Sequence, residues 1–234
     1  MSNLYSPTPQ DVERHRKLRA VAAALNQRII DTIPRRTVGE VADAIGIRHD
    51  GVLALDTEDV SSVLMDCCLY DWYENGRNVV GRYVETHPEP PGTDEGFLLS
   101  AYLQAKYRIL VVRSTVRGAG LHCHDVLNRE ELFLMDIALS QTAPCDAALA
   151  TRTIPLGGHS MTSGAGLPVA SREASLRMLE RLEMERPKAV YGPGGLALLI
   201  VRVCLAAGAG HHVRYETPGP RASRPRKKPG RRRR

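Results

Sequence analysis

The sequence predicts an α+β fold in which a helical N-terminal half is followed by a small antiparallel β-barrel, two C-terminal helices and a basic tail. Three observations support this prediction. Apolar residues recur at helical spacing through roughly the first hundred residues. Short β-branched runs separated by turn residues begin at residue 108. The last 21 residues contain ten Lys or Arg and one acidic residue.

The N-terminal half is expected to form a helical domain at 11–107, after a disordered start at 1–10. In the first helix, Leu18, Leu25 and Ile29 share one apolar stripe, and Pro34 is expected to end it. Acidic residues open a later helix at its positive N-terminal end, where they are favourable. The expected helices cover 11–33, 38–45, 59–74, 79–86 and 94–106, with an extended connector at 51–55.

The pattern changes at residue 108, so a barrel domain is expected at 108–170. Glycine, asparagine and acidic residues separate apolar runs of strand length. Five short strands joined by tight turns match the size of an SH3-like barrel. The runs start at 108, 121, 132, 148 and 159. The expected barrel interior contains Val111, Leu121, Cys123, Leu132, Leu134 and Ile154.

The C-terminal part divides into expected helices within 171–213 and a disordered basic tail at 214–234. The helices are expected at 171–185 and 196–207. The tail carries a net charge of about +9, whereas the remainder holds 22 basic and 25 acidic side chains. Four prolines and like-charge repulsion keep such a segment extended. The positive charge of the protein is therefore expected on an appendage and not on a basic folded surface.

This tail is the clearest functional feature of the sequence. Flexible Arg-rich segments bind phosphate backbones by releasing counterions, and guanidinium groups match phosphate bidentately. We therefore expect a non-catalytic protein associated with RNA or DNA at low sequence specificity. An acidic protein is the alternative partner, and a solubilising run without a specific role is the simplest interpretation. The expected contact residues are Arg221, Arg224, Arg226, Lys227, Lys228, Arg231, Arg232, Arg233 and Arg234.

Two other classes of function stay open. The first is a protein-interaction adaptor that uses the barrel or a helical groove. The second is a metal-dependent enzyme, because His122 and His124 would share one face of a strand and imidazole is a common zinc ligand. The fold would have to bring in a third ligand, such as His159 or Asp136. An exposed histidine pair is the more ordinary interpretation, so no metal site and no cofactor is expected.

Other catalytic or DNA-binding motifs are incomplete, so an enzyme is not expected. The segment 158–162 is one residue from a nucleophile elbow, but Thr162 stands where the final glycine is needed. The segment 37–47 has the spacing of a first helix of a helix-turn-helix, yet no basic recognition helix follows. The glycine-rich segments lack the Lys-Ser/Thr ending of a phosphate loop.

The sequence also predicts a cytoplasmic protein without a transmembrane segment. Residues 1–11 are polar and hold no apolar run typical of a signal peptide. The longest apolar stretch, 195–210, is shorter than the roughly 20 apolar residues that a membrane span needs. The five cysteines are scattered and odd in number, which indicates reduced thiols and not a disulfide framework.

Several segments together resemble a family of uncharacterised bacterial proteins. They are Leu64-Met65-Asp66 with Tyr70, 118–127, Met135-Asp136, Ala150-Thr151-Arg152 and 161–165. The resemblance spans 40–170 and implies a helical N-terminal half and a small β-barrel, with no established activity. Some members of that family end in a short Cys/His zinc motif of the kind found at the SecA C-terminus. No cysteine follows Cys204 here, so this zinc motif is not expected.

Overall fold

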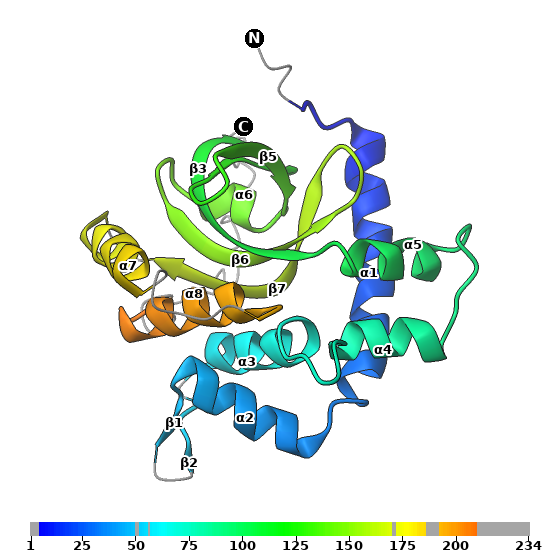
Figure 1. Cartoon of the computed structure of the whole chain (residues 1–234). Helices are drawn as coiled ribbons and strands as arrows, with labels where there is room; N and C mark the ends of the chain where they lie inside the picture. Colours follow the sequence, from blue (N-terminus) through cyan, green and yellow to red (C-terminus); the bar gives the residue numbers. More distant parts are fainter. Residues whose placement is uncertain (1–4, 50–51, 56, 170–171, 186–191, 210–234) are drawn as a thin grey trace, which may run out of the picture.

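A computed structural model describes residues 5–49, 52–55, 57–169, 172–185 and 192–209. Within these ranges, the chain forms eight helices and a closed five-stranded barrel, and the helices lie mainly along one side of the barrel (Figure 1). The expected α+β class, with helices before and after a small barrel, is confirmed. The expected basic tail and the first four residues of the expected disordered start lie outside the described residues.

Helix α1 (Pro9–Ile30) begins two residues before the expected start because of a capping box. The Thr8 hydroxyl accepts a hydrogen bond from the Asp11 backbone N–H at 3.2 Å. The Asp11 carboxylate in turn accepts one from the Thr8 backbone N–H at 2.8 Å. This reciprocal pair satisfies two backbone donors that a helix start otherwise leaves open, and Pro9 suits the first helical turn.

Helix α3 (Glu58–Tyr70) ends earlier than expected because the chain must form a tight turn soon after it. Asn75 and Gly76 both adopt positive φ, at 52° and 76°. Glu74 and Arg77 exchange backbone hydrogen bonds across these two residues, which is the pattern of a type I′ turn. The other N-terminal elements are α2 (Arg35–Ile45), α4 (Val79–Thr86), α5 (Asp94–Tyr102), and a hairpin, β1 (Arg48–His49) with β2 (Val52–Leu53), where an extended connector was expected.

The barrel has the strand order β3-β4-β5-β7-β6. Four strand pairs are antiparallel, but β5 and β7 are parallel, so a wholly antiparallel barrel is wrong at this one contact. The chain leaves β5, forms the short helix α6 and strand β6, and returns as β7 beside β5. The bounds are β3 (Lys106–Val116), β4 (Gly120–Asp125), β5 (Glu130–Met135), α6 (Leu139–Thr142), β6 (Ala148–Pro155) and β7 (Ser160–Val169).

The barrel interior is a small apolar cluster. It consists of Leu110 and Val112 on β3, Leu121 and Cys123 on β4, and Leu134 on β5. Each of these side chains is at most 2% exposed. Three of the expected interior residues, Leu121, Cys123 and Leu134, are therefore confirmed.

Of the other three, Leu132 also packs against the interior cluster, whereas the expectation was wrong for Val111 and Ile154. Val111 is half-buried because its neighbours on β3 occupy the interior and side chains alternate along a strand. Residues 109–112 are all apolar, so polarity could not indicate which alternate pair faces inward. Leu132 is half-buried at the edge of the interior cluster. Ile154 is buried, but it packs among the helices on the outer side of the barrel.

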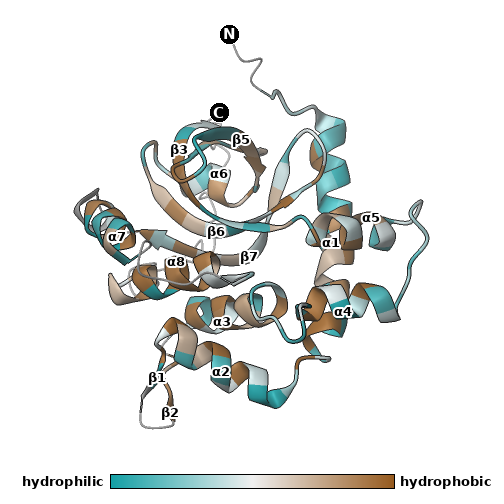
Figure 2. Cartoon of the chain, in the orientation of Figure 1, coloured by the Kyte–Doolittle hydropathy of each residue, from teal (hydrophilic) through white to brown (hydrophobic). Residues whose placement is uncertain are grey.

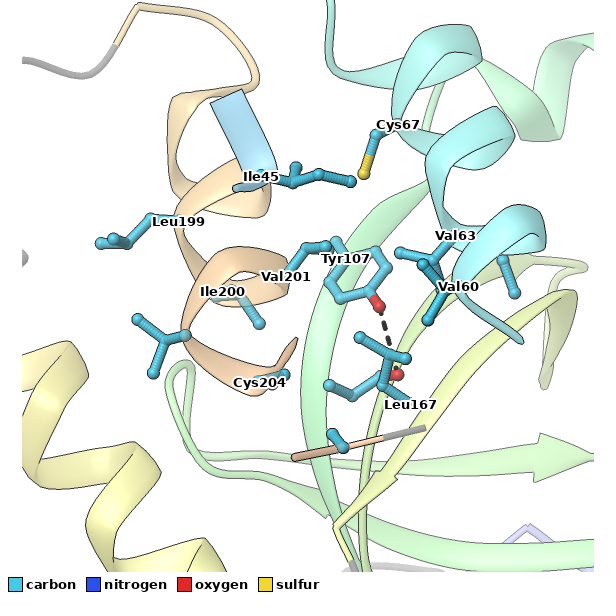
Figure 3. Packing of buried hydrophobic residues seen from close by; sticks show 14 of the residues in the cluster. Ile45, Val60, Val63, Cys67, Tyr107, Leu167, Leu199, Ile200, Val201 and Cys204 are labelled. Carbon is cyan, nitrogen blue, oxygen red and sulfur yellow. Dashed lines mark hydrogen bonds between the residues drawn. The ribbon is translucent and has the colours of Figure 1, made fainter. Parts of the chain in front are cut away.

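The helices bury the outer faces of β6 and β7, so these strands are covered on both sides. The C-terminal helices are α7 (Arg172–Glu185) and α8 (Gly195–Ala206), and α8 is the more apolar of the two (Figure 2). Figure 3 shows Tyr107 of β3 between Val201 of α8 and Val63 of α3. The Tyr107 hydroxyl donates a hydrogen bond to the Ala150 carbonyl oxygen at 3.3 Å. None of the helices in the described ranges is long and apolar enough to cross a membrane.

We expect Leu134→Ala to lower the free energy of unfolding by about 2 to 5 kcal/mol, because it leaves a cavity at a fully buried site. Urea denaturation followed by circular dichroism measures this change. Leu103→Ala is the matched control, since Leu103 is 55% exposed, and it should cost less than about 0.5 kcal/mol. Equal costs for the two variants would contradict the assignment of the barrel interior.

Candidate functional site

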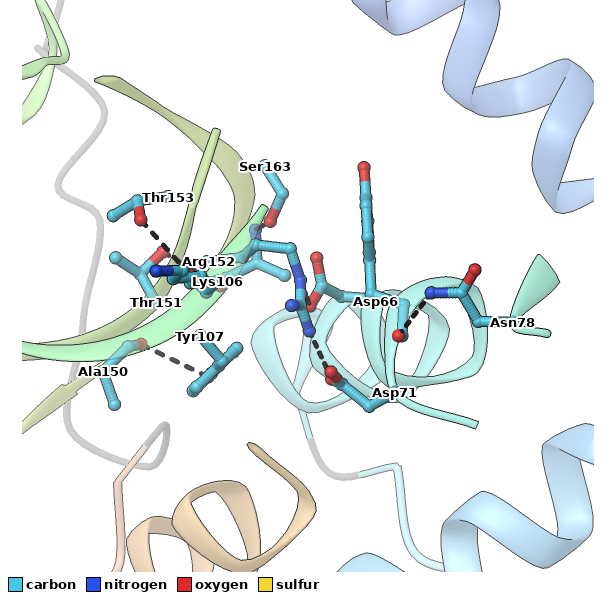
Figure 4. Close-up of polar contacts among 12 residues, drawn as sticks. Asp66, Asp71, Asn78, Lys106, Tyr107, Ala150, Thr151, Arg152, Thr153 and Ser163 are labelled. Carbon is cyan, nitrogen blue, oxygen red and sulfur yellow. Dashed lines mark hydrogen bonds and ion pairs between the residues drawn. The ribbon is translucent and has the colours of Figure 1, made fainter. Parts of the chain in front are cut away.

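A buried arginine joins the barrel to the helical part of the protein. Arg152 lies on β6 and is 1% exposed. Its Nε–H donates to Oδ2 of Asp66 at 2.7 Å, and its Nη2 group donates to Oδ2 of Asp71. Figure 4 shows the guanidinium extending from the strand toward both carboxylates of the α3 segment. We call Arg152, Asp66 and Asp71 the arginine cluster.

Local structure explains how α3 presents these groups. Asp66 and Tyr70 lie four residues apart, so they occupy the same face of the helix. Asp71 follows as the C-cap residue. The Arg152 guanidinium carbon lies 4.4 Å from the centre of the Tyr70 ring and 5.3 Å from that of Tyr107. Both rings therefore stabilise the buried cation through cation–π contacts.

The arginine cluster carries one carboxylate more than its single guanidinium can neutralise. Burial raises the pKa of Asp71, and the neighbouring Asp66 adds to this shift while Arg152 opposes it. Burial also acts against the charge of Arg152, but the two carboxylates outweigh this effect and raise its pKa. Burial raises the pKa of Tyr70 well above its ordinary value, so its hydroxyl is protonated. The net charge of the cluster is −1 when both carboxylates are ionised, and the raised pKa of Asp71 moves this charge toward zero.

A cleft of about 310 Å³ adjoins the arginine cluster between α1, α3 and β7. Three buried polar atoms of its lining residues have no hydrogen-bond partner within the described part of the chain. They are Oδ1 of Asp66, the hydroxyl of Tyr70 and Oδ1 of Asn26. Buried polar atoms are normally paired, so such a group of atoms indicates a site for a ligand or for ordered water.

The composition of this cleft suits binding. Ser61 and Ser62 of α3 and Ser163 of β7 add hydroxyl groups to its wall. Ile30 and Leu69 add apolar surface on the two helices. A few convergent polar groups on an apolar wall are typical of small-molecule sites. We call this site the α1–α3–β7 cleft.

In the structure, both histidines of the alternative metal site have other partners. His124 and His122 are both half-buried on β4, but the Nδ1 atom of His124 lies 2.7 Å from Oε1 of Glu131. The His122 ring packs edge-on against Phe133 at 4.9 Å between centroids. In the described ranges, no three His, Cys, Asp or Glu side chains are arranged to hold a metal ion.

His159 and Asp136, the two candidates for a third ligand of the alternative metal site, also have other partners. His159 lies beside Tyr5, whose hydroxyl is 3.2 Å from its Nδ1 atom. Asp136 accepts a hydrogen bond from the Leu139 backbone N–H at 3.0 Å at the start of α6. Its second oxygen accepts one from the Thr162 hydroxyl at 3.3 Å. Asp136 thus stabilises the connection after β5.

The buried His15 and the half-buried His159 lie where α1 meets the barrel. The rings of His15 and His159 are 6.4 Å apart, and His15 is 4% exposed. Burial, followed by the positive charge of Arg19, lowers the pKa of His15 to about 4. Burial also lowers the pKa of His159. Both imidazoles are therefore neutral at pH 7.

The protein is therefore of the α+β class. It has a closed five-stranded barrel, and the arginine cluster links this barrel to helix α3. Residues 9–188 match a family of unknown function, DUF7986, and the chain belongs to that family. A comparison with curated proteins and one with solved structures found no match. The family match includes the range 40–170 on which the resemblance was based. The bacterial origin and the zinc motif of some members stay predictions.

Neither the arginine cluster nor the cleft was predicted from the sequence. The Arg- and Lys-rich contact residues that were predicted lie outside the described residues. Asp66, Tyr70 and Arg152 contributed only to the family resemblance, yet they meet at one site. One signal was present, because Asp66 is the lone acid in an apolar helical run and Arg152 the lone cation in a strand. Charged residues in such runs are rarely buried unless they are paired.

We expect Arg152→Met to lower the free energy of unfolding by about 3 to 5 kcal/mol, because it leaves two buried carboxylates without their cation. The triple variant Asp66→Leu, Asp71→Leu, Arg152→Met should recover most of this loss, since it removes every buried charge of the cluster. Urea denaturation of both variants measures the difference. A triple variant no more stable than the single one would contradict this account of the cluster.

His15 should make the protein less stable as pH falls. Its folded-state pKa of about 4 lies below the unfolded value of 6.5, so the unfolded chain binds the proton first. This contribution is lost progressively as pH falls from 6.5 to 4. The raised pKa of Asp71 acts in the opposite direction, because the folded state then binds a proton more readily.

The variant His15→Leu separates the two effects, because Asp71 is present in both proteins. Between pH 8 and pH 5, the wild type should lose about 2 kcal/mol more stability than the variant. Urea denaturation at a series of pH values measures both curves. Parallel curves would show that His15 is protonated equally in the folded and unfolded states.

Proposed function

We propose that this protein is a non-catalytic, nucleic-acid-associated protein that binds phosphate through its Arg- and Lys-rich segment 214–234. The observation that carries the proposal is the segregation of charge along the chain. Ten cations and one acid fall in this segment, whereas the first 213 residues have a small excess of acid. Clustered Arg side chains bind phosphate backbones with little dependence on the base sequence.

Ion pairing within the folded part supports this assignment. Most of its described arginines lie against carboxylates, at the surface as well as in the arginine cluster. Such pairs cancel local positive potential, so the folded part offers a polyanion little free cationic surface. The paired arginines include Arg14, Arg28, Arg36, Arg48, Arg77, Arg82, Arg108, Arg113, Arg152, Arg181 and Arg202.

A salt titration tests the proposal. The affinity for a mixed-sequence single-stranded RNA, and for a mixed-sequence DNA duplex, should fall linearly in a plot of log affinity against log salt. The expected slope is about −0.7 to −0.9 for each phosphate neutralised. Replacing Arg231, Arg232, Arg233 and Arg234 with Gln should weaken binding to every sequence alike and flatten the slope by up to about 3. Fluorescence anisotropy measures both effects.

The matched control removes the same number of charges from the folded part. Arg16, Lys17, Arg35 and Arg113 are exposed, and their replacement with Gln should leave the slope nearly unchanged. Equal flattening by both variants would assign binding to overall charge and not to the segment. Absence of binding at low salt would refute the proposal and favour a protein-interaction adaptor.

A further inference from the structure

We propose that the α1–α3–β7 cleft binds a small alkylammonium compound, with its ammonium group on Asp66 and Asn26 and its alkyl chain on the apolar wall. This site is separate from segment 214–234, and the proposal does not depend on nucleic-acid binding. Its starting point is the set of buried polar atoms that line the cleft without a partner in the described part of the chain.

The unpaired atoms select a ligand that donates hydrogen bonds. Oδ1 of Asp66 and Oδ1 of Asn26 only accept, and the Tyr70 hydroxyl can accept as well as donate. Asp66 is 4% exposed and Tyr70 is 5% exposed. A buried acceptor without a donor is costly, so a ligand with several N–H groups would satisfy all three atoms.

The charge of the neighbouring cluster selects a cation. Arg152 occupies only Oδ2 of Asp66, which leaves Oδ1 of the same carboxylate buried and unpaired on a residue that lines the cleft. Two carboxylates face one guanidinium in the arginine cluster, so its net charge is −1 when both are ionised. Burial raises the pKa of Asp71 to about 7, so at pH 7 the net charge of the cluster lies between zero and −1. An ammonium group at Oδ1 would balance this charge, whereas an anion would be repelled.

The apolar part of the wall and the volume of the cleft limit the size and the polarity of the part of the ligand beyond its ammonium group. Ile30, Met65, Leu69 and Ala165 supply apolar surface beside the polar atoms. The cleft volume of about 310 Å³ lies near the lower end of the range for small-molecule sites. A short aliphatic chain can lie against this apolar surface while its ammonium group contacts the polar side chains.

The test uses n-butylammonium as the probe and follows amide signals of the full chain by two-dimensional NMR at pH 7. We expect saturable shifts at Asn26, Ser62, Ser163 and Gly164, with a dissociation constant on the order of 1 mM for so small a ligand. n-Butanol and butyrate have similar chains without the positive charge, and they should bind at least about ten-fold more weakly. Equal shifts with n-butanol, or no saturable shifts with n-butylammonium, would overturn the proposal.

Two variants of the cleft and one control assign the binding to these residues. Asn26→Leu keeps the branching of the side chain but removes its acceptor, and it should weaken n-butylammonium binding about ten-fold. Ser62→Trp adds a large side chain to the exposed wall of the cleft and should abolish binding while the helix is retained. Gln27→Leu makes the same amide-to-leucine change one residue along α1, on an exposed side chain, and should leave binding unchanged. Unchanged binding in both cleft variants would refute the site.

The ammonium group could belong to a free amine or to the lysine side chain of a peptide. Nα-acetyl-lysine N-methylamide carries the same alkylammonium group on a peptide backbone. Weaker binding of this compound than of n-butylammonium supports the free amine that we propose. Tighter binding would overturn that choice and assign the cleft to a lysine side chain.

Discussion

The packing of helix α3 against the barrel depends on the burial of one arginine. Arg152 is on a barrel strand, and both of its carboxylate partners are on α3 or its C-cap. Removing any of these charges from water costs free energy. The attraction between the charges offsets this cost only when all three groups meet with good geometry. A shift of α3 along the barrel would separate them, so the cluster restricts the register of two elements that apolar contacts alone would hold less specifically.

The same constraint shapes the α1–α3–β7 cleft. Asp66 uses one oxygen to hold Arg152, so its side chain cannot rotate to find a partner for the other oxygen. The Tyr70 ring is likewise kept in place by the guanidinium that lies over it. The polar atoms of the cleft are therefore fixed by the fold before any ligand arrives, and preorganisation of this kind lowers the entropic cost of binding.

Local sequence signals predicted the elements better than their contacts. The bounds of α4 and β6 agree with the expected ranges because caps and turn residues mark them clearly. The inward-facing residues of β3 were missed because residues 109–112 are all apolar. The parallel contact of β5 with β7 was missed because it forms only when the barrel closes. The arginine cluster was missed for a related reason, because Asp66 and Arg152 are 86 residues apart and only the tertiary fold brings them together.

The two proposed binding regions differ in how strongly salt should affect them. Segment 214–234 would bind through many cations along a phosphate backbone, and counterion release makes such binding steeply salt-dependent. The cleft would hold a single cation on a carboxylate that is 4% exposed, and ions in solution screen buried pairs much less than exposed ones. Moderate salt would therefore release a polyanion while an amine stayed bound. The opposite signs of charge also mean that neither ligand should compete for the other's site, so each can be studied in the full chain.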